Sequence, residues 1–182
     1  MSRTIGSLVY FRPLERADIE RGWHGWINDP VANEHLLGAF PVTKDELNRY
    51  YDTSQPPSSV MFAVCTKEDE KYIGNVRLGS IDWVNRICTY GRLLGDPAYR
   101  GKGYGTDALI LLLRYGFHTL GMNRIWSTAD SMNDISLRSN EKVGMKQEGR
   151  MRQALYRDGA YRDTIILSML REDFDKLYGG TN

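Results

Sequence analysis

Apolar residues along the chain follow two repeating patterns. Runs of strand length, apolar or alternating, cover residues 8–12, 60–66, 72–82, 87–94, 123–129, 145–156 and 160–170. Helical spacing covers residues 15–28, 44–52 and 106–120, and a shorter stretch that opens at 133 and ends by 145. This order of elements predicts a mixed α/β layer fold around one sheet, in a single domain over residues 1–182.

Local start and stop residues support these elements. Thr43 with Glu46 three residues later is typical of a helix capping box, and Gly121 is placed to end the long apolar helix. Asp158 and Gly159, between the last two strands, favour a tight type I′ turn. Residues 31–40, which include His35, predict no definite element.

The helix over 106–120 is apolar on nearly every face, because residues 109–113 read Leu-Ile-Leu-Leu-Leu. Such a helix is either buried on both sides within one chain or covered on one side by a second subunit. Together with an exposed strand over 164–170, the second alternative makes a homodimer a candidate assembly.

Composition narrows the class of protein. The net charge is +1 and 26% of residues are charged, which gives no basis for nucleic-acid binding. Cys65 and Cys88 lie in strand-like runs and read as core residues, and His24, His35 and His118 lack ligand spacing, so we expect no metal site. No signal peptide or membrane-length apolar run is visible, and we therefore expect a cytoplasmic protein that contacts no membrane.

The chemistry-bearing stretch runs from Leu93 to Thr106, with sequence LLGDPAYRGKGYGT. An apolar strand stops at Gly-Asp-Pro, glycines alternate with basic residues, and the apolar helix follows. A glycine-rich loop at a helix N-terminus suits a phosphate or pyrophosphate. The spacing fits neither the P-loop nor the dinucleotide fingerprint, but it does fit Arg-x-x-Gly-x-Gly at Arg100, Gly103 and Gly105. The alternative interpretation is a basic turn before a buried helix.

This loop resembles the acyl-CoA pyrophosphate loop of the GNAT superfamily of N-acetyltransferases. The order of motifs from Gly91 to Leu170 is similar to the branch that includes ribosomal-protein N-terminal, spermidine and amino-sugar acetyltransferases. The resemblance implies a mostly antiparallel sheet flanked by helices, splayed between the strands that end near Leu94 and Ala129, with the pantetheine arm of acetyl-CoA in the splay. It implies cofactor contacts at Leu93, Leu94, Gly95, Arg100, Gly101, Lys102, Gly103, Tyr104, Gly105, Thr106, Asn133 and Asn140.

Within that set, the backbone amides of Leu93 and Leu94 are expected to hold the developing oxyanion, which makes Leu94 a catalytic position. Asn133 is expected to contact the cofactor arm or an ordered water, although an asparagine there also suits a helix N-cap. Arg138 and Lys142 are candidates for the 3′-phosphate of CoA.

Two positions depart from the pattern of the branch. Many relatives carry a tyrosine that protonates the thiolate where this chain has Asn140, and a glutamate where it has Thr89. Asn140 can hydrogen-bond a thiolate but cannot act as an acid, and Thr89 is no useful base. Either water performs the proton transfers or other residues have taken over. Candidates near strand ends are Asp82, Tyr90, Asp130 and Tyr161.

The acceptor site is predicted at Trp26, Asn28, Asp29 and Tyr90, because a Trp-x-Asn-Asp-Pro stretch resembles amino-sugar acetyltransferases of this branch. A buried tryptophan followed by a helix stop explains the same stretch equally well. We expect a primary amine on a small molecule, with an amino sugar, free or nucleotide-linked, preferred. Protein N-terminal amines and polyamines are the alternatives, the latter with a thin set of carboxylates at Glu34, Asp45 and Glu46. A non-catalytic acyl-CoA-binding module and a binder of other phosphates are competing hypotheses.

Overall fold

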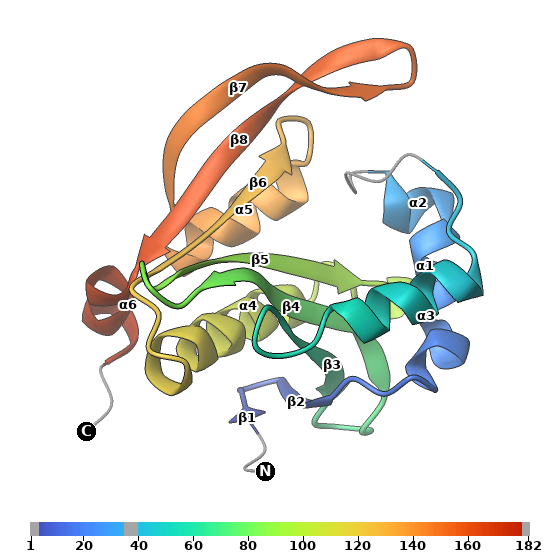
Figure 1. The fold of residues 1–182 in the computed structure, drawn as a ribbon, viewed down its shortest axis with the longest axis horizontal. Helices are drawn as coiled ribbons and strands as arrows, with labels where there is room; N and C mark the ends of the chain where they lie inside the picture. Colours follow the sequence, from blue (N-terminus) through green and yellow to red (C-terminus); the bar gives the residue numbers. More distant parts are fainter. Residues whose placement is uncertain (1–3, 35–39, 180–182) are drawn as a thin grey trace.

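The computed structural model describes residues 4–34 and 40–179, and its centre is an eight-stranded sheet in the order β1-β2-β3-β4-β5-β6-β8-β7 (Figure 1). All neighbouring strands are antiparallel except β5 and β6. This arrangement confirms the predicted fold class. The strands are β1 (Thr4–Ile5), β2 (Val9–Pro13), β3 (Val60–Thr66), β4 (Tyr72–Asp82), β5 (Ile87–Leu94), β6 (Arg124–Asp130), β7 (Lys146–Arg157) and β8 (Ala160–Leu170).

The parallel pair β5–β6 is short and then opens. Pairing runs only from Ile87 with Arg124 to Thr89 with Trp126, and the rest of each strand diverges from the other (Figure 1). We call this divergence, from Tyr90 to Leu94 on β5, the β5–β6 splay. The splay confirms the expected opening of the sheet. Strand β6 ends at Asp130, one residue after the predicted end at Ala129.

Helical elements cover both faces of the sheet. One apolar cluster packs α4 (Tyr104–Arg114), its π-helical continuation η3 (Tyr115–Thr119), α5 (Asp134–Val143) and α6 (Arg171–Tyr178) against residues such as Val64. A second cluster packs η1 (Ile19–Trp23) and α3 (Lys44–Thr53) against Ala63. Because successive residues of a strand point to opposite faces, Ala63 and Val64 mark the two sides of the sheet.

Several local predictions are confirmed. Thr43 and Glu46 form the capping box of α3, and both Asp158 and Gly159 have the positive φ that a type I′ turn requires. Cys65 and Cys88 are buried and free.

Other elements differ from the prediction. The expected helix over 15–28 is divided into the π-helical turn η1 and α1 (His24–Asn28), because Gly22 leaves helical geometry, and a short α2 (Pro30–Asn33) follows. A Cβ at Gly22 would lie 2.6 Å from the Trp26 ring, so the kink depends on the glycine. β1, α6 and the 3₁₀ turn η2 (Pro97–Tyr99) were not expected, since each is too short or too polar to show a period.

The two features that suggested a homodimer, the apolar helix and the strand over 164–170, are both covered by other elements of the same chain. The leucines of α4 are buried by the sheet, η3 and α5, and β8 is flanked by β6 and β7 rather than exposed at an edge. The homodimer therefore stays a prediction without these two arguments. In residues 4–34 and 40–179, the helices lack the length and apolarity needed to cross a membrane.

Candidate active site

The glycine-rich loop leads into helix α4, whose N-terminus has no side-chain cap. Gly103 is the N-cap of α4, with φ of 89° and no side-chain cap, and Gly101 has φ of 73°. The first intrahelical hydrogen bond runs from the Asp107 amide to the Gly103 carbonyl at 3.0 Å. The amides of Tyr104, Gly105 and Thr106 precede that bond and lie at the positive end of the helix dipole. These amides, which sequence reasoning selected, suit an anionic ligand such as a pyrophosphate.

The basic side chains of the loop have different roles. Arg100 donates to the Gly95 carbonyl at 2.8 Å, so its guanidinium braces the loop. Lys102 is exposed, as are Gly101 and Gly103. Asp96, which interrupts the loop with a negative charge, is paired with Lys71 at 2.9 Å.

Strand β5 supplies a row of amides along the splay. The Gly95 amide donates to the Ile73 carbonyl of β4, and the β4–β5 register is regular up to Leu94. Because backbone groups of successive residues point to opposite edges of a strand, the amides of Tyr90, Arg92 and Leu94 point toward the splay. The Leu93 amide points toward β4. Among the two leucines expected to hold the oxyanion, the register therefore favours Leu94.

Arg92 is a functional candidate that the sequence did not reveal. Its guanidinium donates to the Gly105 carbonyl and, at 3.1 Å, to the Ser139 hydroxyl, which also lies 3.2 Å from Thr106 Oγ1. Burial lowers the pKa of Arg92. None of the described carboxylates forms an ion pair with it, so its charge is available to an anion at the start of α4.

At the closed end of the splay, Tyr90 and Asn140 meet. The Tyr90 phenol donates a hydrogen bond to Asn140 Oδ1, and the two residues are 8% and 1% exposed. Asn140 Nδ2 lies 3.5 Å from the Ser136 hydroxyl. Burial raises the pKa of Tyr90, so the phenol keeps its proton at neutral pH. The sequence selected both residues for different roles, and the structure brings them together.

The remaining candidates have local partners. Asn133 caps α5 by accepting from the Ser136 amide at 2.9 Å, and Thr89 donates to the Gly79 carbonyl at 2.9 Å. Asp82 accepts from the turn amides that follow β4, and Asp130 is fully buried against Arg162 at 3.1 Å. Tyr161 packs on Tyr156 in the β7–β8 hairpin, away from the loop.

A pocket of about 500 Å³ lies on the face of the sheet that η1 and α3 cover. We call it the β4–β5 pocket; its walls include Trp23, Phe40, Glu46, Tyr50, Asn75 and Arg77, and it reaches Tyr90 and Arg92 on β5. It therefore adjoins the closed end of the splay from the opposite face. A molecule in this pocket and a ligand in the splay can meet at β5.

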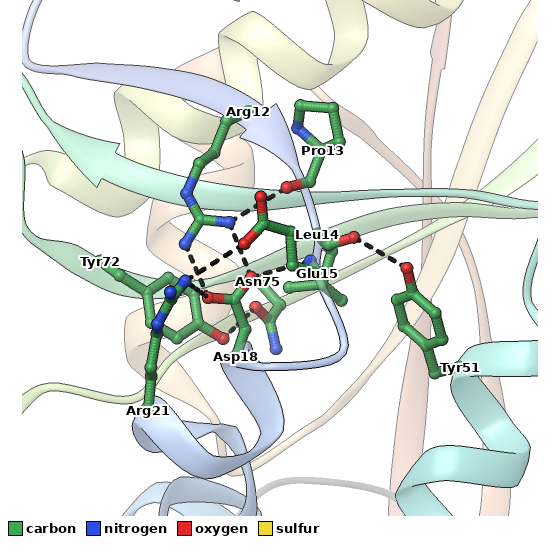
Figure 2. Close-up of polar contacts among 9 residues, drawn as sticks. All are labelled: Arg12, Pro13, Leu14, Glu15, Asp18, Arg21, Tyr51, Tyr72 and Asn75. Carbon is green, nitrogen blue, oxygen red and sulfur yellow. Dashed lines mark hydrogen bonds and ion pairs between the residues drawn. The ribbon is translucent and has the colours of Figure 1, made fainter.

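Asn75 lines this pocket and carries a donor that has no partner. Figure 2 shows Tyr72 and Asn75 beside the buried pair of Arg12 and Asp18, whose atoms form two hydrogen bonds of 2.7 Å. The Tyr72 hydroxyl donates to Asn75 Oδ1 at 2.6 Å, which leaves Asn75 Nδ2 as the free end of the amide. Asn75 is 8% exposed, and Nδ2 has no hydrogen-bond partner.

The charges of this network fix the direction of the Tyr72 bond. Burial opposes ionisation of Asp18, but hydrogen bonds from Arg12 and the Glu15 amide outweigh it and hold the pKa of Asp18 below its usual value. Burial and the nearby Asp18 charge raise the pKa of Tyr72. Tyr72 therefore keeps its proton, and its hydroxyl donates to Asn75 Oδ1.

Within the Trp-x-Asn-Asp-Pro stretch, Ile27 lines the pocket, whereas Trp26, Asn28 and Asp29 make other contacts. Trp26 packs on Tyr72 at 4.9 Å and covers Gly95. Asn28 bonds both backbone groups of Val42 at 2.8 Å, and Asp29 caps α2. Asn28 thus holds the segment that forms one side of the pocket, while its predicted contact with an acceptor stays a prediction.

No group of three His, Cys, Asp or Glu side chains in the described part of the chain is arranged to hold a metal ion. His118 bonds Asp175 at 2.7 Å and joins η3 to α6, and His35 lies outside the described residues.

The loop, the splay and the adjoining pocket agree with a comparison to protein families. A family model described as an acetyltransferase (GNAT) domain matches residues 9–146. The chain belongs to the GNAT acetyltransferases. It is accordingly an acetyl-CoA-dependent N-acetyltransferase, and its uncapped α4 amides, with Arg92 beneath them, fit the pyrophosphate of that cosubstrate.

Individual GNAT relatives cover most of the chain. The SPbeta prophage-derived uncharacterized N-acetyltransferase YokL of Bacillus subtilis (strain 168) is 28% identical over 77% of this chain and 78% of its own. The spermidine N(1)-acetyltransferase of Escherichia coli (strain K12) is 28% identical over 91% and 88%. A crystal structure of spermidine N-acetyltransferase from Vibrio cholerae, in complex with CoA and spermine, has a TM-score of 0.84 at 22% identity and covers 91% of this chain and 97% of its own.

Proposed function

We propose that this enzyme acetylates a primary amine on a small molecule that also carries hydrogen-bonding oxygen atoms, with an amino sugar the preferred class. The amine would enter the β4–β5 pocket and meet the acetyl group at β5. The observation that carries this proposal is Asn75 Nδ2, a buried donor without an acceptor on a residue that lines the pocket.

An unpaired buried donor costs about 1–3 kcal/mol, which a ligand oxygen placed on it would recover. Tyr72 occupies the oxygen of the Asn75 amide, so the NH₂ group is the end left for a ligand. The site therefore favours a hydroxyl or carbonyl oxygen at this point. The aromatic side chains of Trp23, Phe40 and Tyr50 supply a wall for the body of such a molecule.

The charge of the pocket argues against a polyamine. Among the described residues in its walls, Glu46 is the one carboxylate, and it already accepts from the backbone and hydroxyl of Thr43. Arg77 places a positive charge on the same walls. A polyamine carries several positive charges, and this pocket does not compensate them. The spermidine acetyltransferases among the relatives nevertheless keep a polyamine as the main competitor.

A panel of amines tests the proposal, with release of free CoA thiol as the readout. We expect amino sugars to give higher kcat/KM than spermidine or peptides with a free N-terminus. Asn75→Leu should raise the KM for the best acceptor about 5- to 150-fold, as expected for about 1–3 kcal/mol, with little change in the KM for acetyl-CoA.

Asn75→Asp is the matched control, because it keeps the shape and the bond from Tyr72 but removes the donor. It should weaken oxygen-bearing acceptors and improve cationic ones. Higher activity of the wild type toward spermidine than toward every amino sugar would contradict the acceptor assignment. Binding of acetyl-CoA without turnover of any amine would favour the non-catalytic module.

A further inference from the structure

The phenol of Tyr90, on β5, lies next to Asn140 on α5, the position at which many relatives carry a tyrosine. In many relatives of the branch that this chain resembles, a tyrosine protonates the departing thiolate from the position where this chain has Asn140. The Tyr90 hydroxyl reaches across from β5 and donates to that asparagine. A phenol is thus present beside α5, carried by β5.

The position of Tyr90 along the splay agrees with this role. It directly follows the last β5–β6 pair, Thr89 with Trp126, and so lies where the two strands begin to separate. The start of α4 lies beside the other end of the splay, where Gly105 is next to the side chains of Arg92 and Leu94. The four residue steps from Tyr90 to Leu94 span about 13 Å at the usual strand rise. An extended arm that starts with its pyrophosphate at α4 therefore brings its thioester toward Tyr90.

We propose that Tyr90 is the acid that protonates the thiolate in this enzyme, and that Asn140 is a positioning residue that holds the phenol. The proposal rests on the acetyl transfer proposed above. The amine nitrogen forms a bond to the carbonyl carbon, and the carbon–sulfur bond breaks with its electron pair left on sulfur. The Tyr90 proton moves to that sulfur. Water takes the surplus proton from nitrogen and returns one to the phenolate, so the products are an amide and free CoA thiol.

A purely structural role for Tyr90 makes a different prediction. Buried tyrosines usually find a hydrogen-bond partner, and Asn140 would serve that need alone. In that case loss of the hydroxyl would reduce thermal stability and leave the chemical step unchanged. Measurement of kcat distinguishes the two roles of Tyr90. Loss of the hydroxyl lowers kcat at saturating substrate if Tyr90 is the acid, and leaves kcat unchanged if its role is structural.

Tyr90→Phe tests the proposal, compared with Asn140→Tyr and the double variant in the full-length enzyme. We expect Tyr90→Phe to lower kcat about 100-fold, with the Kd for acetyl-CoA from calorimetry within twofold of the wild type. The double variant Tyr90→Phe/Asn140→Tyr moves the phenol back to α5 and should recover kcat to within about tenfold of the wild type, which a structural role would not predict.

A folded Tyr90→Phe enzyme with wild-type kcat would overturn the proposal. So would a double variant that folds and binds acetyl-CoA but stays as slow as Tyr90→Phe. If Tyr90→Phe does not fold, the rescue in the double variant decides by itself. Failure of the wild type to turn over any amine would instead contradict the proposed function.

Discussion

Asp107 shows how a single side chain connects the cofactor loop to the start of the chain. Its carboxylate accepts hydrogen bonds from the amides of Ser7, Leu8 and Val9 at 2.7–3.0 Å. Asp107 also donates the first intrahelical bond of α4 through its own amide. Asp107 therefore ties the β1–β2 turn to the N-terminal end of α4.

Replacement of Asp107 by alanine should lower the free energy of unfolding by about 2 kcal/mol, since hydrogen bonds to charged groups contribute roughly 1.5–3 kcal/mol. Urea unfolding measures this change. Asp134→Ala is the control, because Asp134 begins α5 but makes only an exposed pair with Arg138 at 3.3 Å. That control should lose less than about 1 kcal/mol. Equal losses in the two variants would contradict the special role of Asp107.

Among the elements, the strands around the splay differ in how firmly they are joined. At the closed end, Arg124 on β6 bonds Glu148 on β7 and, at 3.2 Å, the Ser168 hydroxyl on β8, so one guanidinium links three strands. Beyond Thr89 and Trp126, no β5–β6 pair follows in the described chain. The splay is thus open beyond Thr89 and Trp126, whereas the contacts of Arg124 hold the strands together near its closed end.

The Arg124–Glu148 interaction predicts that the stability of the fold depends on pH. Hydrogen bonds from Arg124 and Ser168 lower the pKa of Glu148 to about 2, from 4.5 in the unfolded chain. The folded state therefore binds fewer protons, and the stabilisation is present above pH 4.5 and is lost as the pH falls toward 2. The melting temperature of Glu148→Gln should consequently fall less between pH 6 and pH 3 than that of the wild type.

Glu141→Gln, an exposed change on α5, should keep the pH dependence of the wild type. If Glu148→Gln and the wild type lose the same number of degrees over this pH range, the Arg124–Glu148 pair does not contribute as described.

For the whole molecule, local patterns in the sequence were sufficient to predict most strands and helices and the glycine loop, with Gly103 at the start of α4. The splay was implied by the resemblance to the GNAT superfamily. The contacts of Asn75 with Tyr72, and of Tyr90 with Asn140, could not be predicted in the same way. The second joins residues fifty positions apart, and the free donor on Asn75 follows from a bond rather than a motif. The mostly charged α6 was missed because Phe174 is its one fully buried side chain.

The most direct test of the account is calorimetry of acetyl-CoA binding to the wild type, Gly103→Glu and Gly159→Glu. Both glycines are exposed and have positive φ, 89° and 79°, so the same strain and charge are introduced at the start of α4 and at the β7–β8 turn. We expect the wild type and Gly159→Glu to bind alike and Gly103→Glu to bind at least about tenfold more weakly, because its carboxylate repels the pyrophosphate. Equal binding by a folded Gly103→Glu protein, or no binding by the wild type, would contradict the assignment of this loop.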